Sequence, residues 1–219
     1  HQARRFAPQH RGSVWGGRSL RPDVPGPAAE AWGGYEHDRV TAGPYQGKTL
    51  GELAAAFPGA LLGQPPATQG GRFPLLIKIL DCAEWLSVQV HPDDAQARRL
   101  EGAHQQGKTE AWHVLRAAPG ASLLCGLQPG STPEGVADAV RGGAILEQIQ
   151  RLEMRAGDSI LIQAGMLHAL GPGLMVYEVQ QTSDITYRVY DWDRPASGSR
   201  PLHIDKSLRV IDPGLQPRV

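Results

Sequence analysis

Cysteine is scarce in this 219-residue sequence, in which Cys82 and Cys125 are the only two and both lie in apolar segments. There is no Cys-x-x-Cys pair, which argues against a metal site built from thiolates. Two buried, reduced thiols are therefore the favoured interpretation, and a disulfide is the lesser alternative. This cysteine pattern is typical of a cytoplasmic protein.

Net charge and long apolar segments are also lacking. Lysine and arginine number 22, as do aspartate and glutamate, so the formal charge is zero. Broad nucleic-acid binding needs a basic surface, and we expect none here. No apolar run approaches the roughly 20 residues of a membrane-spanning helix, and the first residues lack the apolar core of a signal peptide. A single phosphorylated metabolite remains a possible partner, because it needs only a local basic pocket.

Glycine and proline are abundant, at 27 and 18 residues, which favours turns and short strands. Residues 1–48 are expected to be loop-like. Helical insertions are expected at about 49–57, 92–101 and 131–150, with Thr49 and Glu52 forming a capping box and Pro92 in the first turn of the second helix. The expected strands lie at residues 75–80, 85–90, 110–115, 122–127, 159–163, 166–170, 174–181 and 185–192. Many short strands with few long helices indicate a β-barrel or β-sandwich.

The first polar pattern lies in the strand before Pro92. Alternate side chains of a strand share a face, so Gln89 and His91 project together while Val88 and Val90 face a core. This arrangement is typical of a strand that lines a site. Taken alone, however, a histidine in a strand is more often a structural residue.

A second alternation begins after Gly107. Lys108, Glu110 and Trp112 fall on one face of the expected strand, and His113 falls on the opposite face. A solvated ion pair between Lys108 and Glu110 is the simplest interpretation of this segment by itself.

The third pattern runs from Gly157 to His168 and resembles the second cupin motif, G-x5-P-x-G-x2-H, with Gln163 where proline is usual. In that motif the glycines make tight turns and the histidine faces the interior of a barrel. Together the three segments offer two imidazoles, a carboxylate and an amide oxygen, a ligand set suited to zinc or a similar cation.

The chain as a whole resembles the type I mannose-6-phosphate isomerases (phosphomannose isomerases) of the short bacterial kind. The matching segments occur in the family's order and cover most of residues 13–211. They are residues 15–17 (WGG), 30–32 (EAW), 73–78 (FPLLIK), 86–94 (LSVQVHPDD), 107–112 (GKTEAW), 164–169 (AGMLHA) and 180–191 (QQTSDITYRVYD).

This resemblance implies a mainly β fold, a cupin-type double-stranded β-helix barrel with short helical insertions, formed by residues 1–219 as a single catalytic domain. It implies one bound Zn2+, or another divalent metal, held by Gln89, His91, Glu110 and His168. Arg188 matches the residue usually designated catalytic, and Lys108 and Asp184 match positions for substrate contact or proton transfer. The implied reaction interconverts mannose 6-phosphate and fructose 6-phosphate through a cis-enediol.

Three alternatives stay open at this point. Arg188 could form a structural ion pair with Asp191 or Asp193 instead of acting in catalysis. The chain could be a non-catalytic cupin that binds a sugar phosphate, or an iron-dependent cupin oxygenase. Longer family members continue into a further β region that we expect to be absent here, and we expect a monomer or a homodimer.

Overall fold

Two antiparallel β-sheets make up most of the structure, a computed structural model that describes residues 6, 8–63, 73–195 and 200–219. Residues 1–5 and 7, part of the expected N-terminal loop, lie outside the described residues. The six-stranded sheet has the order β1 (Gln9–Arg11), β2 (Glu30–Trp32), β3 (Leu75–Asp81), β10 (Leu174–Gln181), β5 (Glu110–Ala117) and β8 (Ser159–Ile162). The five-stranded sheet has the order β11 (Tyr187–Tyr190), β4 (Val88–Val90), β9 (His168–Leu170), β6 (Ser122–Leu127) and β7 (Ile149–Glu153).

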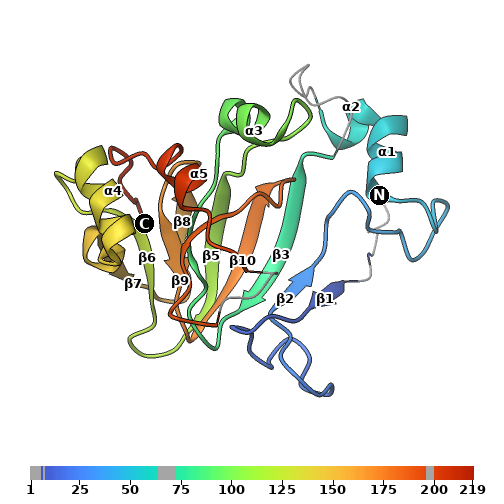
Figure 1. The fold of residues 1–219 in the computed structure, drawn as a ribbon. Helices are drawn as coiled ribbons and strands as arrows, with labels where there is room; N and C mark the ends of the chain where they lie inside the picture. Colours follow the sequence, from blue (N-terminus) through green and yellow to red (C-terminus); the bar gives the residue numbers. More distant parts are fainter. Residues whose placement is uncertain (1–5, 7, 64–72, 196–199) are drawn as a thin grey trace.

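The inner faces of the two sheets share a hydrophobic core. Figure 1 shows the long strands β3, β10 and β5 side by side, with the helices at the periphery. Buried residues of both sheets meet in one cluster, including Leu80, Val114, Ile160 and Val176 from the six-stranded sheet and Leu123, Cys125 and Leu170 from the five-stranded sheet. The alternating strand patterns in the sequence thus match a two-layer mainly β fold, as predicted.

The outer faces of the two sheets differ. The five-stranded sheet is covered by α4 (Pro133–Gly142), a 3-10 helix (Ile145–Gln148) and α5 (Ile204–Leu208), whose apolar residues pack with Leu124 of β6. Every residue of β6 is therefore buried. On β5 of the other sheet, by contrast, Ala111, His113 and Leu115 are exposed. A strand such as β5 has one face for the interior and one for solvent.

Capping residues set where the first helices begin. Helix α1 (Leu50–Ala56) is capped by Thr49, whose capping box with Glu52 is present as predicted, and α2 (Pro58–Leu61) follows it. Helix α3 (Asp94–Glu101) is capped by Asp93. Pro92 thus precedes the cap, and its predicted place in the first turn is wrong.

The helical segment predicted for residues 131–150 is shorter than expected. Helix α4 ends at Gly142, and Gly143 adopts a left-handed conformation with φ 77°, which ends a helix readily. After the 3-10 helix the chain enters β7, which pairs with β6. In the same way, the segment expected to be loop-like contains β1 and β2, which pair with each other and connect to β3.

Gly107 permits a close approach of two backbone segments just before the strand that carries Glu110. A Cβ atom at this position would lie 2.5 Å from the carbonyl carbon of Asp93 and 2.6 Å from the nitrogen of Asp94. We expect Gly107→Ala to lower the free energy of unfolding by about 1–3 kcal/mol, because these backbone atoms must move. Urea denaturation measures the difference.

Gly142→Ala is the matched control for this substitution. Nothing lies within 4 Å of a Cβ added to Gly142, and the residue is in a helix, where alanine is favoured. Equal stability of the two variants would contradict the steric argument for Gly107.

Cys82 and Cys125 are free thiols, and both are buried, which confirms the interpretation of the sequence. Burial raises the pKa of Cys125 to about 12. Burial also raises the pKa of Cys82, and the carboxylate of Asp81 raises it further. Neither thiol is therefore ionised near neutral pH, and neither is reactive there.

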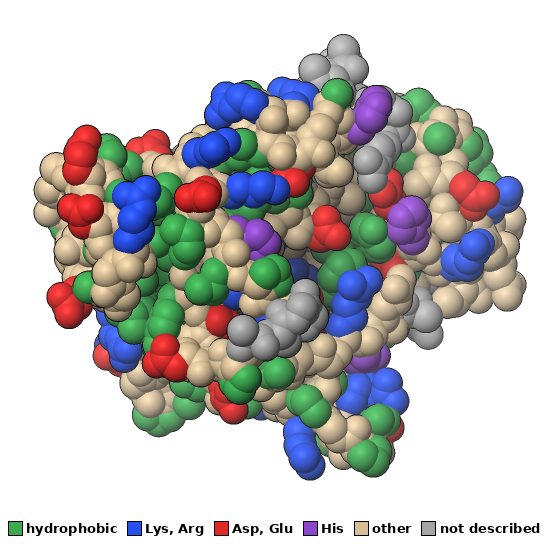
Figure 2. Space-filling view, viewed as in Figure 1, with side chains coloured by type: hydrophobic (Ala, Val, Ile, Leu, Met, Phe, Trp, Pro, Cys, Tyr) green, Lys and Arg blue, Asp and Glu red, His purple; other side chains and the backbone are tan. Residues whose placement is uncertain are grey.

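The described part of the chain contains no helix long and apolar enough to cross a membrane. Side chains of both charges occur across the face shown in Figure 2. This mixture agrees with the formal charge of zero.

Candidate metal centre

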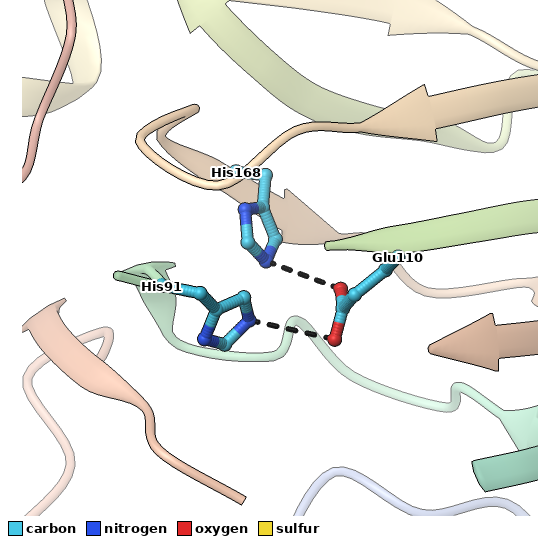
Figure 3. A group of neighbouring side chains, drawn as sticks. All are labelled: His91, Glu110 and His168. Atoms are coloured by element: carbon cyan, nitrogen blue, oxygen red, sulfur yellow. Dashed lines mark ion pairs between the residues drawn. The ribbon is translucent and has the colours of Figure 1, made fainter. Parts of the chain in front are cut away.

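Three side chains that are far apart in the sequence meet between the sheets. His91 follows β4, Glu110 is the first residue of β5 and His168 is the first of β9. Both histidines direct a ring nitrogen toward the Glu110 carboxylate (Figure 3). The Nε2 atom of His91 lies 3.5 Å from Oε1 of Glu110, and the Nε2 atom of His168 lies 3.7 Å from Oε2. All three side chains are buried, and they form a potential metal site.

The two imidazoles are held in the orientation that a metal ligand needs. The Nδ1 atom of His91 lies 2.8 Å from the carbonyl oxygen of Ile185, and that of His168 lies 2.8 Å from the carbonyl oxygen of Met166. A carbonyl oxygen can only accept a hydrogen bond, so each Nδ1 carries the proton. Each Nε2 therefore keeps a lone pair that faces the site.

Gln89 reaches the same centre through the register of the five-stranded sheet. It lies opposite His168 on β9 and opposite Arg188 on β11. Its Nε2 atom lies 3.4 Å from Nε2 of His168, while its Oε1 atom accepts a hydrogen bond of 3.2 Å from Ser87. A half-turn of the amide would present Oε1 to the centre, so Gln89 can serve as a fourth ligand.

The charges of the centre suit a cation. Burial lowers the pKa of His91, and the adjacent Lys108 ammonium lowers it further. Burial also lowers the pKa of His168. Burial alone would raise the pKa of Glu110, but the combined charges of Lys108, His91, His168 and Lys78 outweigh burial, so the pKa lies below its ordinary value. Near neutral pH the centre thus holds neutral imidazoles and an ionised carboxylate, the forms that bind a metal.

The spacing of the donor atoms also fits a bound ion. Zinc binds nitrogen and oxygen at about 2.0–2.2 Å, which puts two ligand atoms of a tetrahedral shell roughly 3.3–3.6 Å apart. The two nitrogen–oxygen distances to Glu110, 3.5 and 3.7 Å, are close to that value. Moreover, Oε2 of Glu110 is buried and has no hydrogen-bond partner among the described residues. The ligand set therefore fits zinc or a similar divalent ion.

Lys108 already supplies positive charge at this centre. Its ammonium contacts Oε1 of Glu110 and lies 3.2 Å from Nε2 of His91. The side chains that face inward here are those of Lys108, just before β5, and of Glu110 and Trp112 within it. His113 is exposed on the opposite face of the strand. The predicted alternation is thus present, and the lysine–glutamate pair is buried instead of solvated.

A cavity of about 260 Å³ is lined by two of the four candidate ligands, Gln89 and Glu110. One row of its lining crosses the six-stranded sheet, because Trp32, Lys78, Glu178 and Trp112 lie opposite one another on β2, β3, β10 and β5. Trp112 also contacts the ring of His168, at 5.4 Å between ring centres. The cavity thus connects the metal ligands to a second polar row on the facing sheet.

Glu178 is the residue in this row that the sequence analysis missed. Its side chain is buried, Trp112 donates a hydrogen bond of 2.8 Å to Oε2, and the Lys78 ammonium lies 3.0 Å from Oε1. Burial raises the pKa of Glu178 and the nearby Glu110 raises it further, although Lys78 opposes both. Alternation along residues 174–181 places Glu178 on the same face as Val176, a signal that could have identified it.

Arg188 lines the cavity and forms neither of the ion pairs considered as alternatives. Asp191 is bound by Arg194 and Arg200, and Asp193 accepts a hydrogen bond from Tyr190. Arg188 instead donates a hydrogen bond of 3.0 Å to the carbonyl oxygen of Pro201. Its Nε atom is buried without a partner among the described residues, so part of the guanidinium is available to a ligand.

Asp184 is not brought together with the other candidate residues. It is exposed and lines a neighbouring cleft of about 170 Å³ together with Tyr35 and His104. In this segment it is the backbone carbonyl of Ile185 that reaches the centre, through His91. Its carboxylate therefore does not line the cavity beside the metal ligands, in contrast to Lys108 and Arg188.

Known proteins resemble the chain in both sequence and structure. The family model described as "Phosphomannose isomerase type I, catalytic domain" matches residues 10–113. Mannose-6-phosphate isomerase of Streptococcus mutans is 39% identical over 212 residues, or 92% of this chain and 65% of that protein. Mannose-6-phosphate isomerase ManA of Bacillus subtilis is 37% identical over 217 residues, or 94% of this chain and 67% of that protein. The chain spans about two thirds of the length of these relatives.

The crystal structure of the mannose 6-phosphate isomerase from Bacillus subtilis superposes on the whole chain with a TM-score of 0.88 and 33% identity, covering 71% of that protein. This agreement confirms the predicted mainly β, cupin-type fold. The chain therefore belongs to the type I phosphomannose isomerase family.

Proposed function

We propose that this chain interconverts mannose 6-phosphate and fructose 6-phosphate. The observation that carries the proposal is the buried centre of His91, Glu110 and His168 beside a cavity that holds a second, separately placed carboxylate, Glu178. Isomerisation of an aldose to a ketose needs both parts. One must stabilise negative charge on the sugar oxygens, and the other must move a proton between two carbon atoms.

We propose that Gln89, His91, Glu110 and His168 hold one Zn2+. The mixed nitrogen and oxygen donors, the absence of thiolates among them and the donor spacing support this choice. When bound, the ion supplies positive charge that stabilises the negative charge developing on the sugar oxygens.

Glu178 is the group best placed to move the proton. As a carboxylate it would accept the proton from carbon 2 of the aldose, which leaves a cis-enediolate, and it would return that proton to carbon 1. The hydroxyl proton of O2 would pass to O1 in the same reaction, so that carbon 2 becomes the carbonyl of the ketose. Burial raises its pKa from the ordinary range, as a group that both accepts and returns a proton requires. Lys78 and Trp112 hold the carboxylate in place. This role replaces the one expected for Asp184, which is exposed.

Arg188 and Lys108 would act on the substrate oxygens. The unpartnered Nε of Arg188 can donate to an oxygen that gains charge during the reaction, and its guanidinium stays protonated throughout. Lys108 is already paired with Glu110, so it suits contact with a sugar hydroxyl better than binding of a whole phosphate group.

We also propose that residues 1–219 act as one catalytic domain, because residues of both sheets share one core. The expected monomer or homodimer and the expected cytoplasmic location remain predictions.

The deciding test is an assay of the purified, zinc-loaded chain with mannose 6-phosphate, in which fructose 6-phosphate is detected by a coupled enzyme. Turnover that disappears on treatment with a chelator and returns with added Zn2+ is the expected result. Folded, metal-loaded protein that binds mannose 6-phosphate without converting it would contradict the proposal. It would support a non-catalytic sugar-phosphate-binding cupin instead.

A further inference from the structure

The cavity beside the metal ligands carries more positive than negative charge. Among the residues that the structure describes, five basic and three acidic side chains line it. The basic residues are Arg11, Lys78, Lys108, Arg188 and Arg200, and the acidic ones are Glu30, Glu110 and Glu178. A phosphate ester carries about two negative charges near neutral pH. The excess of two positive charges would therefore match one such group.

Three of the five basic side chains are already committed to carboxylates. Lys78 lies 3.0 Å from Glu178, Lys108 contacts Glu110, and Arg200 makes two contacts of 2.7 and 2.8 Å with Asp191. Rearranging any of these would leave a buried or half-buried charge unpaired, which is costly. They are thus poor candidates for binding an additional anion.

Arg11 is the contrasting case. Its side chain forms no ion pair and no hydrogen bond with any residue in the described ranges. Its guanidinium carbon lies 3.6 Å from the ring centre of Trp32, and the indole is in turn fixed by a hydrogen bond of 2.6 Å from Nε1 of Trp32 to Glu30. Stacking occupies the flat face of the guanidinium and leaves its edge, with the N–H donors, available.

The position of Arg11 also suits the far end of a substrate. Arg11 is exposed, whereas Glu110 is 2% exposed and His91 and His168 are each 1% exposed. Of the residues that line the cavity, Glu110 therefore lies at its bottom and Arg11 lies at its mouth. A hexose phosphate with its reacting carbons near the ligands would direct its phosphate toward the mouth.

We propose that Arg11, stacked on Trp32, binds the phosphate group of the substrate and so selects phosphorylated over free sugar. This assignment rests on the proposed isomerase function. Arg188, further into the cavity and partly bonded to Pro201, is left to act at the sugar oxygens.

Three variants of the zinc-loaded chain test the assignment. Arg11→Ala removes the guanidinium, and Arg11→Lys keeps the charge but loses the planar donor edge. Arg21→Ala is the control, because Arg21 is not among the described residues that line either cleft, and its one ion pair within the described part of the chain is a 3.8 Å contact with Asp23. We expect Arg11→Ala to raise KM for mannose 6-phosphate about 10- to 100-fold while kcat changes little, with Arg11→Lys intermediate and Arg21→Ala unchanged.

A second readout separates this inference from the proposed function. Binding of inorganic phosphate, measured by isothermal titration calorimetry, needs no turnover, and it should weaken in Arg11→Ala by a similar factor. If the parent shows no turnover but loses phosphate affinity in Arg11→Ala, the isomerase proposal fails and the phosphate site stands. Unchanged KM and unchanged phosphate affinity in Arg11→Ala would overturn the assignment of Arg11.

Discussion

Replacing His168 by alanine is expected to weaken metal binding at least about 100-fold and to reduce isomerase turnover below detection. His168 contributes one of the two imidazole nitrogens of the centre, and the hydrogen bond from its Nδ1 to the carbonyl oxygen of Met166 fixes the ring so that Nε2 faces the site. Metal content by mass spectrometry after dialysis, together with calorimetric titration of Zn2+, measures the first effect. The coupled assay measures the second.

His113→Ala provides the matched control for that loss. His113 is exposed on the outer face of β5, where it forms a hydrogen bond with Ser159, and it does not line the cavity. Both variants should be compared at equal folded fraction, because removal of a buried side chain also costs stability. A His168→Ala protein that retained one metal ion per chain at the parent's affinity would contradict the proposed ligand set.

Glu178→Gln is expected to lower kcat about 100- to 10,000-fold while the metal stays bound, because the amide cannot accept and return the proton. The substitution preserves the volume of the side chain and its ability to accept the hydrogen bond from Trp112. It removes one of the two carboxylates that pair with Lys78. The other, Glu30, remains, with its Oε2 atom 3.5 Å from the Lys78 ammonium. Steady-state kinetics with metal-loaded protein, at a temperature where both proteins are folded, measures the effect.

Asp184→Asn decides between the two carboxylates considered for proton transfer. Asp184 is exposed in the neighbouring cleft, so we expect its substitution to change kcat by less than about threefold, the range of a surface substitution. Glu153→Gln, on the exposed side of β7, controls for the loss of a carboxylate elsewhere. A larger fall in kcat for Asp184→Asn than for Glu178→Gln would reverse the assignment.

Local patterns in the sequence, either an apolar run or an alternation of apolar and polar residues, predicted several strands well. The strands expected at 122–127 and 174–181 have those bounds in the structure, as β6 and β10. The same rule predicted correctly that Glu110 and His113 face opposite sides of β5. These features depend on side chains within one strand, so the information lies within a few residues.

Features set by distant partners could not be predicted in this way. Strand β2 has three residues in a segment rich in glycine and proline. Its partner strand, β3, is more than 40 residues further along the sequence. The first two residues of β7 fell within the helical segment expected at 131–150, and the pairing of β7 with β6 decides their structure. Tertiary contacts override weak local preference in both places.

In the candidate site, too, some residues could be predicted from local sequence and others depend on contacts between distant segments. Gln89, His91, Glu110 and His168 were found from motifs, and the structure brings them together. Glu178 was missed because its partners, Lys78 and Trp112, come from two other strands. Asp184 was selected because its neighbours in the sequence match the family. Adjacency along the chain does not determine which side chain faces a cavity. In this segment the contact with the centre is made by the backbone carbonyl of Ile185, which accepts a hydrogen bond from His91.

The burial of both cysteines has a practical consequence. Because Cys82 and Cys125 are the only thiols in the chain and neither is ionised near neutral pH, a cysteine introduced at an exposed position would react alone with a maleimide dye. His113 is such a position, on the solvent side of the strand that carries Glu110 on its inner face. A fluorophore attached there would lie on the opposite face of the sheet from the centre. A change in its fluorescence would then report ligand binding, and the dye would not occupy the cavity.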